Sequence, residues 1–401
     1  MKGTAPDPPI AAGLAPTAVG LFIVSLGLRP QLVAIGPLIP QIQADLAISH
    51  AVAGLLGTIP VLCMGVFALV GPWFGRLVGP ERAIAAGVGA LAVFGLARAF
   101  APEVESVLVL TFGVGIGIAV VGPLMPMVVR QRVPGRAALA TGAYAGGIVL
   151  GASLAAGLAV PLAGPDLDWR LPLSIFAAAT GGSLIVWLLL ERRGGSPATA
   201  RTGEPPPKLP WRRRRAWALA LIFAAQSVLF YAAVSWLPSV YVERGWQEVD
   251  AGFLLALMNA VGLLSTFGAP ALAERIGSRR EQLAVSAGAS LAGLLGIAAT
   301  PALAVVWVVL LGIGLGAVFP LALTLPVDFA GRAREVGGLA AIMLFGGYSV
   351  SSVAPFLLGL VRDATGSFDL SLWLMVGVAG SLLAASWFLV PRGLGRANRS
   401  T

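Results

Sequence analysis

The chain has 401 residues, of which 57% are hydrophobic and only 11% are charged. Soluble domains carry about 25% charged residues, so this composition excludes a soluble globular protein and predicts an all-α membrane protein that crosses the bilayer many times. The net charge of +9 and the run from Arg212 to Arg215 follow the positive-inside rule, and we expect no nucleic-acid partner. The single cysteine, Cys63, excludes an intrachain disulfide, and we expect no metal site and no cofactor.

Hydropathy predicts twelve transmembrane helices along the chain. The first keeps its place in the protein, because the N-terminus lacks the charged start and the cleavage site of a signal peptide. The predicted spans cover residues 14–42, 50–72, 82–101, 104–130, 137–163, 170–190, 216–242, 250–273, 281–300, 302–328, 335–361 and 370–390.

The charged residues alternate between the two sides of the predicted membrane. Most of the 27 Lys and Arg fall at the two termini and in every second loop, at 73–82, 131–136, 191–215, 274–280 and 329–334. The opposite loops are acidic and hold only four arginines, namely Arg98, Arg170, Arg244 and Arg362. The positive-inside rule then places both termini in the cytoplasm. We expect the protein to lie in the cytoplasmic (inner) membrane.

The chain divides into two halves of six helices. The halves are residues 1–190 and 216–401, and residues 191–215 form a polar linker rich in Gly, Pro and Arg. An offset of 198 residues aligns Pro72 with Pro270 and also matches nearby glycines and loop arginines. A repeated half in one orientation is typical of two-lobed secondary transporters, in which substrate binds between the lobes near the membrane midplane.

Two loops related by this repeat resemble the signature loop of the major facilitator superfamily. They read GPWFGRLVGPER (71–82) and APALAERIGSRR (269–280), and the resemblance implies a gating role at the cytoplasmic ends of the helices. The second copy has Glu274 where the family usually has Asp, and the first copy has Arg76 there, which departs from the pattern. The gating candidates are Gly71, Arg76, Gly79, Arg82, Glu274, Arg275, Gly277 and Arg280.

Four further strings resemble the cyanate/nitroimidazole transporter branch of that superfamily. They are GLRPQLVAIGPLIPQI (27–42), TIPVLCMGVFA (58–68), QSVLFYAAVSWLP (226–238) and FGGYSVSSVAPFLLGLVRDATGSF (345–368). The branch usually has Asn before the Leu-Arg-Pro triplet, where this chain has Gly27. The resemblance implies a small solute, often anionic or bearing a nitro group, and places the first, fourth, seventh and tenth helices around a central cavity.

Arg29 is the strongest candidate for a substrate contact. It lies mid-way along the first apolar span, where a guanidinium that stays charged costs a few kcal/mol to insert. A polar cavity in which the charge meets an anion would offset that cost, and a buried structural ion pair is the alternative. Pro30 follows directly and can kink the helix at this depth.

Other polar and aromatic side chains at membrane depth are weaker candidates. The seventh helix contributes Gln226, Phe230 and Tyr231, whose amide and phenol groups can orient a small oxyanion or nitro group. Packing and hydrogen bonding between helices are the alternatives for these and for three more candidates, which are Tyr348, Asn259 and Tyr144. His50, at the outer end of the second helix, is expected to be solvated.

The leading hypothesis is a monomeric secondary or facilitative transporter that works by alternating access. We expect its substrate to be a small, singly charged anion or a nitro-compound. A multidrug exporter is the alternative within transport, but the fifth helix lacks the Gly-Pro pair common in exporters. An enzyme or a sensor is disfavoured, because we find no His, Asp, Glu or Ser cluster at depth and no soluble output domain. No carboxylate lies deep in the predicted cavity, so we expect uniport, exchange or proton movement with the substrate itself.

Overall fold

The computed structural model describes residues 11–68, 70–132, 137–193, 209–276, 278–330 and 332–390, and their regular structure is helical. Long apolar helices are the expected result, because a helix satisfies its own backbone hydrogen bonds inside a bilayer. The helices are α1 (Ala11–Leu28), α2 (Pro30–Val33), α3 (Ile35–Leu46), α4 (His50–Val66), α5 (Val70–Val78), α6 (Pro80–Ala99), α7 (Val104–Arg132), α8 (Ala137–Ala163), α9 (Arg170–Arg193), α10 (Arg214–Glu243), α11 (Glu248–Ile276), α12 (Arg279–Ala299), the 3₁₀ turn η2 (Pro301–Leu303), α13 (Ala304–Phe329), α14 (Ala333–Ser351), α15 (Val353–Thr365) and α16 (Asp369–Phe388).

The predicted class of all-helical membrane protein is confirmed. Ten helices of the described residues are long and apolar enough to cross a membrane, with α14 and α15 acting together as one span. Two further spans are bent pairs, one formed by the first-span helices with a 41° bend and one formed by α4 and α5 with a 63° bend. The described chain therefore offers ten to twelve spans, twelve if each bent pair crosses once.

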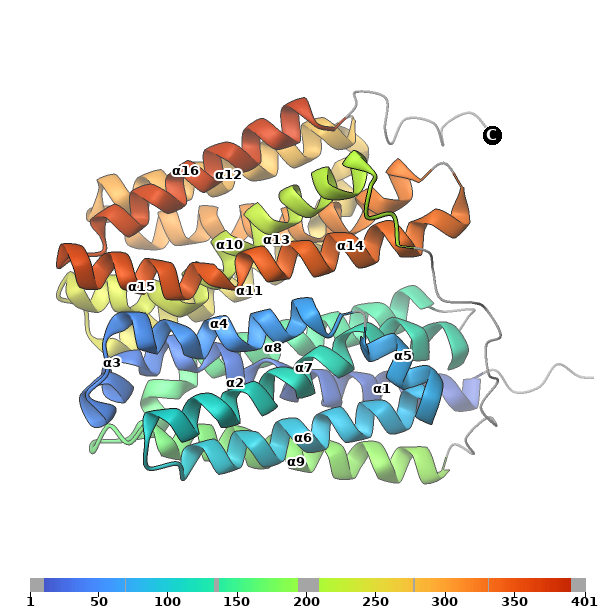
Figure 1. Ribbon diagram of the computed structural model, residues 1–401, viewed down its shortest axis with the longest axis horizontal. Coiled ribbons are helices and arrows are strands. Elements are labelled where there is room, and N and C mark those ends of the chain that lie inside the picture. Colours follow the sequence, from blue (N-terminus) through green and yellow to red (C-terminus); the bar gives the residue numbers. More distant parts are fainter. Residues whose placement is uncertain are drawn as a thin grey trace, which may run out of the picture.

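The helices gather into two bodies that lie side by side (Figure 1). Helices α1 to α9 occupy the lower body in that view and α10 to α16 the upper one. Two pairs make the broad contact between the bodies: α4 packs on α15, and α8 packs on α11.

Glycines let the backbones of the two bodies approach each other closely. A Cβ atom at Gly36 of α3 would lie 2.0 Å from the carbonyl oxygen of Val234 on α10. A Cβ atom at Gly54 of α4 would lie 2.4 Å from the carbonyl oxygen of Pro355 on α15. Small residues at helix crossings are the usual means of association in membranes, where apolar burial gives no driving force.

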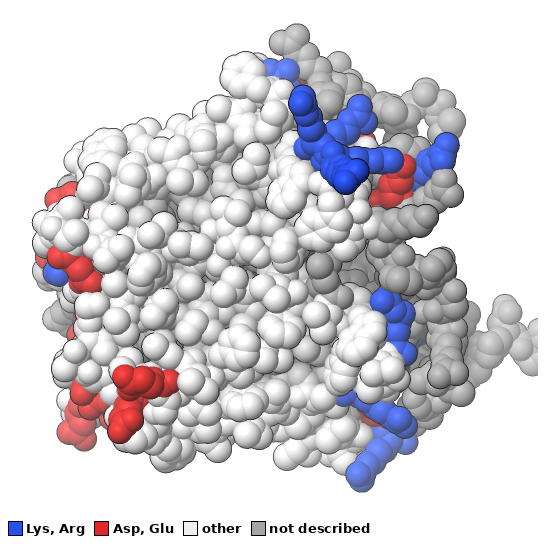
Figure 2. Space-filling view, viewed as in Figure 1, with Lys and Arg blue, Asp and Glu red and all other residues white. Residues whose placement is uncertain are grey.

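Acidic and basic side chains collect at opposite ends of the helices (Figure 2). We call the end that carries Asp45, Glu248 and Asp363 the acidic end, and the end that carries Arg82 and Arg213 the basic end. One assignment from the sequence was wrong. Arg98 does not belong to a loop at the acidic end, because it lies within α6 and its side chain is completely buried.

Candidate functional site

The first span is interrupted at the position of its arginine. Arg29 lies between α1 and α2, and the proline after it has no N–H to continue the helical hydrogen bonds of α1. The carbonyl of Arg29 accepts a hydrogen bond from the N–H of Val33 at 2.9 Å, so the chain resumes helical geometry at once. The 41° bend is measured between residues 17–33 and α3, so it falls at Ala34, four residues after Pro30.

Arg29 reaches from the first body to the second. Its Nη1 donates a hydrogen bond to the hydroxyl of Tyr231 on α10 at 3.0 Å, and its Cζ lies 5.9 Å from the centre of that ring. The tyrosine hydroxyl in turn lies 3.6 Å from the sulfur of Met64 on α4. Among the described residues, no carboxylate forms an ion pair with Arg29. A phenol accepts only part of the hydrogen-bonding capacity of a guanidinium, so the charge is available to an anion.

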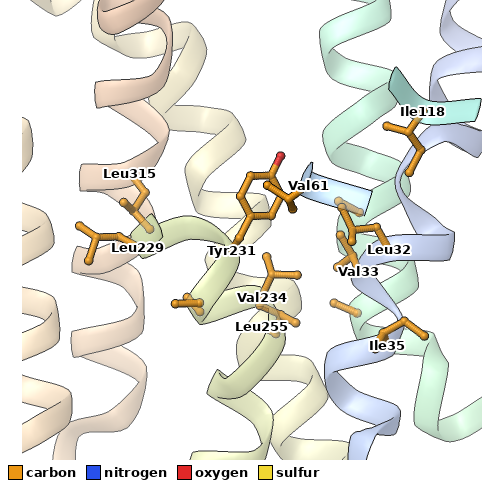
Figure 3. Close-up of a cluster of buried hydrophobic side chains, with 14 of the residues drawn as sticks. Leu32, Val33, Ile35, Val61, Ile118, Leu229, Tyr231, Val234, Leu255 and Leu315 are labelled. Carbon is orange, nitrogen blue, oxygen red and sulfur yellow. The ribbon is translucent and has the colours of Figure 1, made fainter. Parts of the chain in front are cut away.

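Aromatic rings form the wall behind this hydrogen bond. The ring of Tyr231 contacts Phe230 edge-on at 5.3 Å and Tyr348 of α14 at 6.1 Å between ring centres. Figure 3 shows Tyr231 reaching from α10 towards Val61 of α4, with Leu32 of α2 nearby. Edge-to-face packing of this kind holds a ring in one orientation. The hydroxyl that meets Arg29 is therefore held in place by α10 and α14 of the second body.

A cavity of about 110 Å³ opens beside Arg29. Its walls come from the first span and from α8, α10, α11, α13 and α14, whereas α7, the fourth span that resemblance placed there, contributes no residue to them. Most of the lining is apolar, and the polar lining residues are Arg29, Gln226, Ser227, Tyr231, Asn259, Thr266 and Tyr348. A largely apolar pocket with a few convergent polar groups is the usual form of a small-molecule site.

The structure brings together most of the residues proposed from the sequence. Six of them line the cavity, namely Arg29, Gln226, Phe230, Tyr231, Asn259 and Tyr348. Tyr144 lies on α8 but is not among the lining residues. The amide nitrogen of Asn259 donates to the carbonyl of Leu255 at 2.9 Å, and the amide oxygen of Gln226 accepts from the hydroxyl of Ser227 at 3.2 Å.

Two polar lining residues were not proposed as contacts. Ser227 adjoins Gln226 on α10, and Thr266 lies on α11 with its hydroxyl 2.8 Å from the carbonyl oxygen of Gly316 on α13. Asn259 and Thr266 are separated by seven residues, which places them on one face of a helix. That spacing was a signal for Thr266 that the sequence already contained.

The two bodies are joined at the acidic end. The carboxylate of Asp363 on α15 accepts hydrogen bonds from the backbone N–H groups of His50 (3.1 Å) and Ala51 (2.8 Å) at the start of α4, and its Oδ1 lies 2.8 Å from Nδ1 of His50. Gln41 of α3 also hydrogen-bonds Glu248 of α11. His50 is therefore not simply a solvated residue, because it lies in a contact between the bodies.

At the basic end, the described ion pairs stay within one body. Arg132 of α7 pairs with Glu81 of α6 at 3.1 Å and also with Glu191 of α9 at 3.2 Å. In the other body Arg279 of α12 pairs with Asp328 of α13 at 3.0 Å. No described ion pair links the bodies here, whereas hydrogen bonds to Asp363 and Glu248 join them at the acidic end.

The gating candidates that the structure describes lie at this basic end. Gly71 and Arg76 belong to α5, Gly79 precedes α6 with a φ of 95° that favours glycine, and Arg82 is exposed on α6. The guanidinium of Arg280 lies 4.0 Å from the ring centre of Trp387 on α16. The side chains of Glu274 and Arg275, and Gly277 as a whole, lie outside the described residues.

The fold and the cavity define a helical membrane transporter, and comparison with known proteins gives its family. The Major Facilitator Superfamily profile matches residues 17–355, and the chain belongs to this superfamily. The chain is 30% identical to the cyanate transport protein CynX of Escherichia coli (strain K12) over 349 residues, which cover 87% of this chain and 90% of that protein. It is 27% identical to the 2-nitroimidazole transporter of the same strain over 360 residues, covering 90% and 91%. It is 29% identical to the uncharacterized transporter YycB of Bacillus subtilis (strain 168) over 364 residues, covering 89% of each.

Solved structures share the fold at low sequence identity. The inward open conformation of the xylose transporter XylE from E. coli superimposes with a TM-score of 0.74 at 13% identity, covering 94% of this chain and 96% of that one. The nucleoside transporter NupG gives 0.72 at 13% identity, covering 92% and 97%. The chain is therefore a multi-pass membrane transporter rather than an enzyme, and the likeness to the cyanate and nitroimidazole transporters expected from the sequence is confirmed.

Proposed function

We propose that this transporter moves a small, singly charged anion or a nitro-compound through the cavity beside Arg29. The observation that carries the proposal is a guanidinium that lines an apolar cavity with a tyrosine hydroxyl, and no carboxylate, as its hydrogen-bond partner among the described residues. A fixed positive charge in such surroundings is costly unless an anion meets it. A single cation matches one negative charge or a polarised nitro group better than a dianion.

The size and lining of the cavity support a small substrate. A cavity of about 110 Å³ accommodates a cyanate-like or short organic anion. The amide groups of Gln226 and Asn259 are available on the opposite body to orient such a solute. The curated relatives named for cyanate and for 2-nitroimidazole support the same substrate class.

The proposed transport cycle is alternating access between the two bodies. We assign the basic end and both termini to the cytoplasm of a cell with this chain in its inner membrane, following the positive-inside rule. In this assignment the bonds of Asp363 to α4 close the outer side, and the substrate reaches Arg29 from the cytoplasm. Rocking of residues 1–190 against residues 216–401, with 191–215 as the linker, would then expose the cavity to the outside.

The carboxylates of the protein bear on whether transport is coupled to a proton gradient. None of its lining residues is Asp or Glu, and Asp328 pairs with Arg279 at the basic end. We therefore propose uniport, exchange or proton movement on the substrate itself. Uptake into proteoliposomes with and without a pH gradient tests this, and strong proton dependence that Asp328→Asn abolishes would contradict it.

The test of the function is binding and uptake by the purified protein. We would measure the thermal shift caused by cyanate, nitrate, formate, 2-nitroimidazole and, as a control, a lipophilic cation. The ligand with the largest shift is then tested for uptake into proteoliposomes by the wild type and by Arg29→Ala and Arg29→Lys. Loss of both shift and uptake in Arg29→Ala supports the proposal. An unchanged shift in that variant removes Arg29 from the site, and a response to the cation alone favours a multidrug exporter.

A further inference from the structure

A second arginine is buried beside the first span without an acidic partner. Arg98 of α6 has 0% of its surface exposed, and no described carboxylate forms an ion pair with it. Burying an unpaired cation costs several kcal/mol, so its bonds must offset a large penalty. Its Nη2 donates to the backbone carbonyl of Gln31 at 2.8 Å and to the side-chain oxygen of the same residue at 2.7 Å.

The bonds of Arg98 fall on a residue just beyond Arg29 in the interrupted span. Gln31 lies in the short helix α2, between the interruptions at Arg29 and Ala34. Its backbone carbonyl accepts the hydrogen bond from Arg98. The amide nitrogen of Gln31 donates to the carbonyl of Leu173 on α9 at 2.8 Å. A Cβ atom at Gly95 would lie 2.8 Å from Gln31, so the glycine one turn before Arg98 makes room for this side chain.

A third helix supports the guanidinium from behind. Nη1 of Arg98 donates to the hydroxyl of Thr111 on α7 at 3.3 Å, and that hydroxyl donates to the carbonyl of Val107 at 2.7 Å. Gln31 is thus tied to α6 and α9, and its tie to α6 is braced by α7. The segment that begins at Arg29 is therefore held to the first body at Gln31 by bonds to α6 and α9.

We infer that Arg98 is a positioning residue for Arg29: through Gln31 it fixes the short helix α2 to the first body and so holds the Arg29 guanidinium in the cavity. Arg29 hydrogen-bonds Tyr231 of the second body, and this bond would pull on Arg29 when the bodies move apart. Anchoring by Arg98 keeps Arg29 with the first body during that movement. A site must be held to within about 0.5 Å to bind well. Lysine cannot replace Arg98, because one ammonium does not present the planar donor fork. This inference rests on the proposed anion site.

The test has one readout that needs no ligand and one that does. Hydrogen–deuterium exchange of residues 28–36 reports whether α2 is held, and we expect it to be at least about fivefold faster in Arg98→Met than in the wild type. Arg244→Met is the matched control, because Arg244 also binds a helix carbonyl, that of Ile297, at 2.8 Å but lies in the other body. It should leave exchange of residues 28–36 unchanged. If Arg98→Met does not fold, Arg98→Lys and Thr111→Val take its place.

The second readout is the Kd for sodium cyanate, measured per folded molecule in the wild type, in Arg98→Met and in the control Arg244→Met. Arg98→Met should weaken binding about tenfold, because the site is no longer held in place, and Arg244→Met should leave it unchanged. Equal Kd values in the two variants, or unchanged exchange of residues 28–36 in Arg98→Met, overturn the inference. If the wild type does not bind cyanate, or Arg29→Ala binds it as well as the wild type does, the proposed cyanate site at Arg29 fails, and the exchange measurement alone decides whether Arg98 holds α2.

Discussion

Removing the charge of Asp363 should open the acidic end of the transporter. Asp363→Asn keeps the size of the side chain but replaces a carboxylate, which accepts from two backbone N–H groups at the start of α4 and contacts the ring of His50. A hydrogen bond to a charged group contributes about 1.5–3 kcal/mol, and the lower figure applies because 24% of this side chain is exposed. A loss of about 1.4 kcal/mol shifts the balance between closed and open states about tenfold.

Labelling of a buried cysteine from outside measures this shift. Ser235→Cys in a Cys63→Ala background places the thiol where α10 meets α4, since the Ser235 hydroxyl lies 2.6 Å from the position of a Cβ on Gly57. Asp363→Asn should raise the rate of labelling by a membrane-impermeant maleimide about tenfold. Asp369→Asn is the control, because the hydrogen bonds of Asp369 to described residues are with its neighbour Ser367 and none reaches the other body. An unchanged or slower rate in Asp363→Asn would refute the reasoning.

Three further predictions concern the site and the two bodies. Tyr231→Phe removes the acceptor of the Arg29 hydrogen bond and should change the Kd for the transported anion by roughly two- to tenfold, measured by calorimetry. An unchanged Kd would count against a binding site formed by both Arg29 and Tyr231. Gly36→Ala should hold the acidic end open, because its Cβ meets the Val234 carbonyl at 2.0 Å, and spin-label distances across that end would show no lengthening if this is wrong. Arg279→Asp and Asp328→Arg should each lower the free energy of unfolding by about 1–2 kcal/mol in thermal melts, because each breaks the ion pair at 3.0 Å. The double variant should recover most of the lost stability. No recovery would show that the ion pair does not stabilise the fold.

The spans could be predicted from the sequence because apolar length is a local property. The predicted fourth span, 104–130, nearly matches α7 at Val104–Arg132, and most of the predicted site residues line one cavity. These residues were recognisable because polar groups at membrane depth are rare and costly. The bend at Ala34 was less accessible, since Pro30 and Pro37 both disturb the helix and only the surrounding packing decides where the chain turns.

Contacts between distant residues could not be predicted in this way. Arg98 stands at the end of an apolar run, where a loop charge and a buried one look alike until its acceptor, Gln31, is known. His50 looked solvated because its partner, Asp363, is 313 residues away along the chain. Tyr144 was proposed from its depth alone, and depth does not determine which face of a helix meets the cavity.

The ion pairs at the basic end have a consequence for how the chain assembles. Glu81 and Arg279 stand at positions related by the offset of 198 residues, and Arg132 and Asp328 are related by an offset of 196, yet the signs are reversed between the two pairs. If α6 docked on α13 during insertion, Glu81 would face Asp328, and α12 on α7 would bring Arg279 to Arg132. Like charges in half-buried positions repel. The reversed signs therefore favour pairing of α6 with α7 and of α12 with α13, and they disfavour pairing with the equivalent helix of the other half.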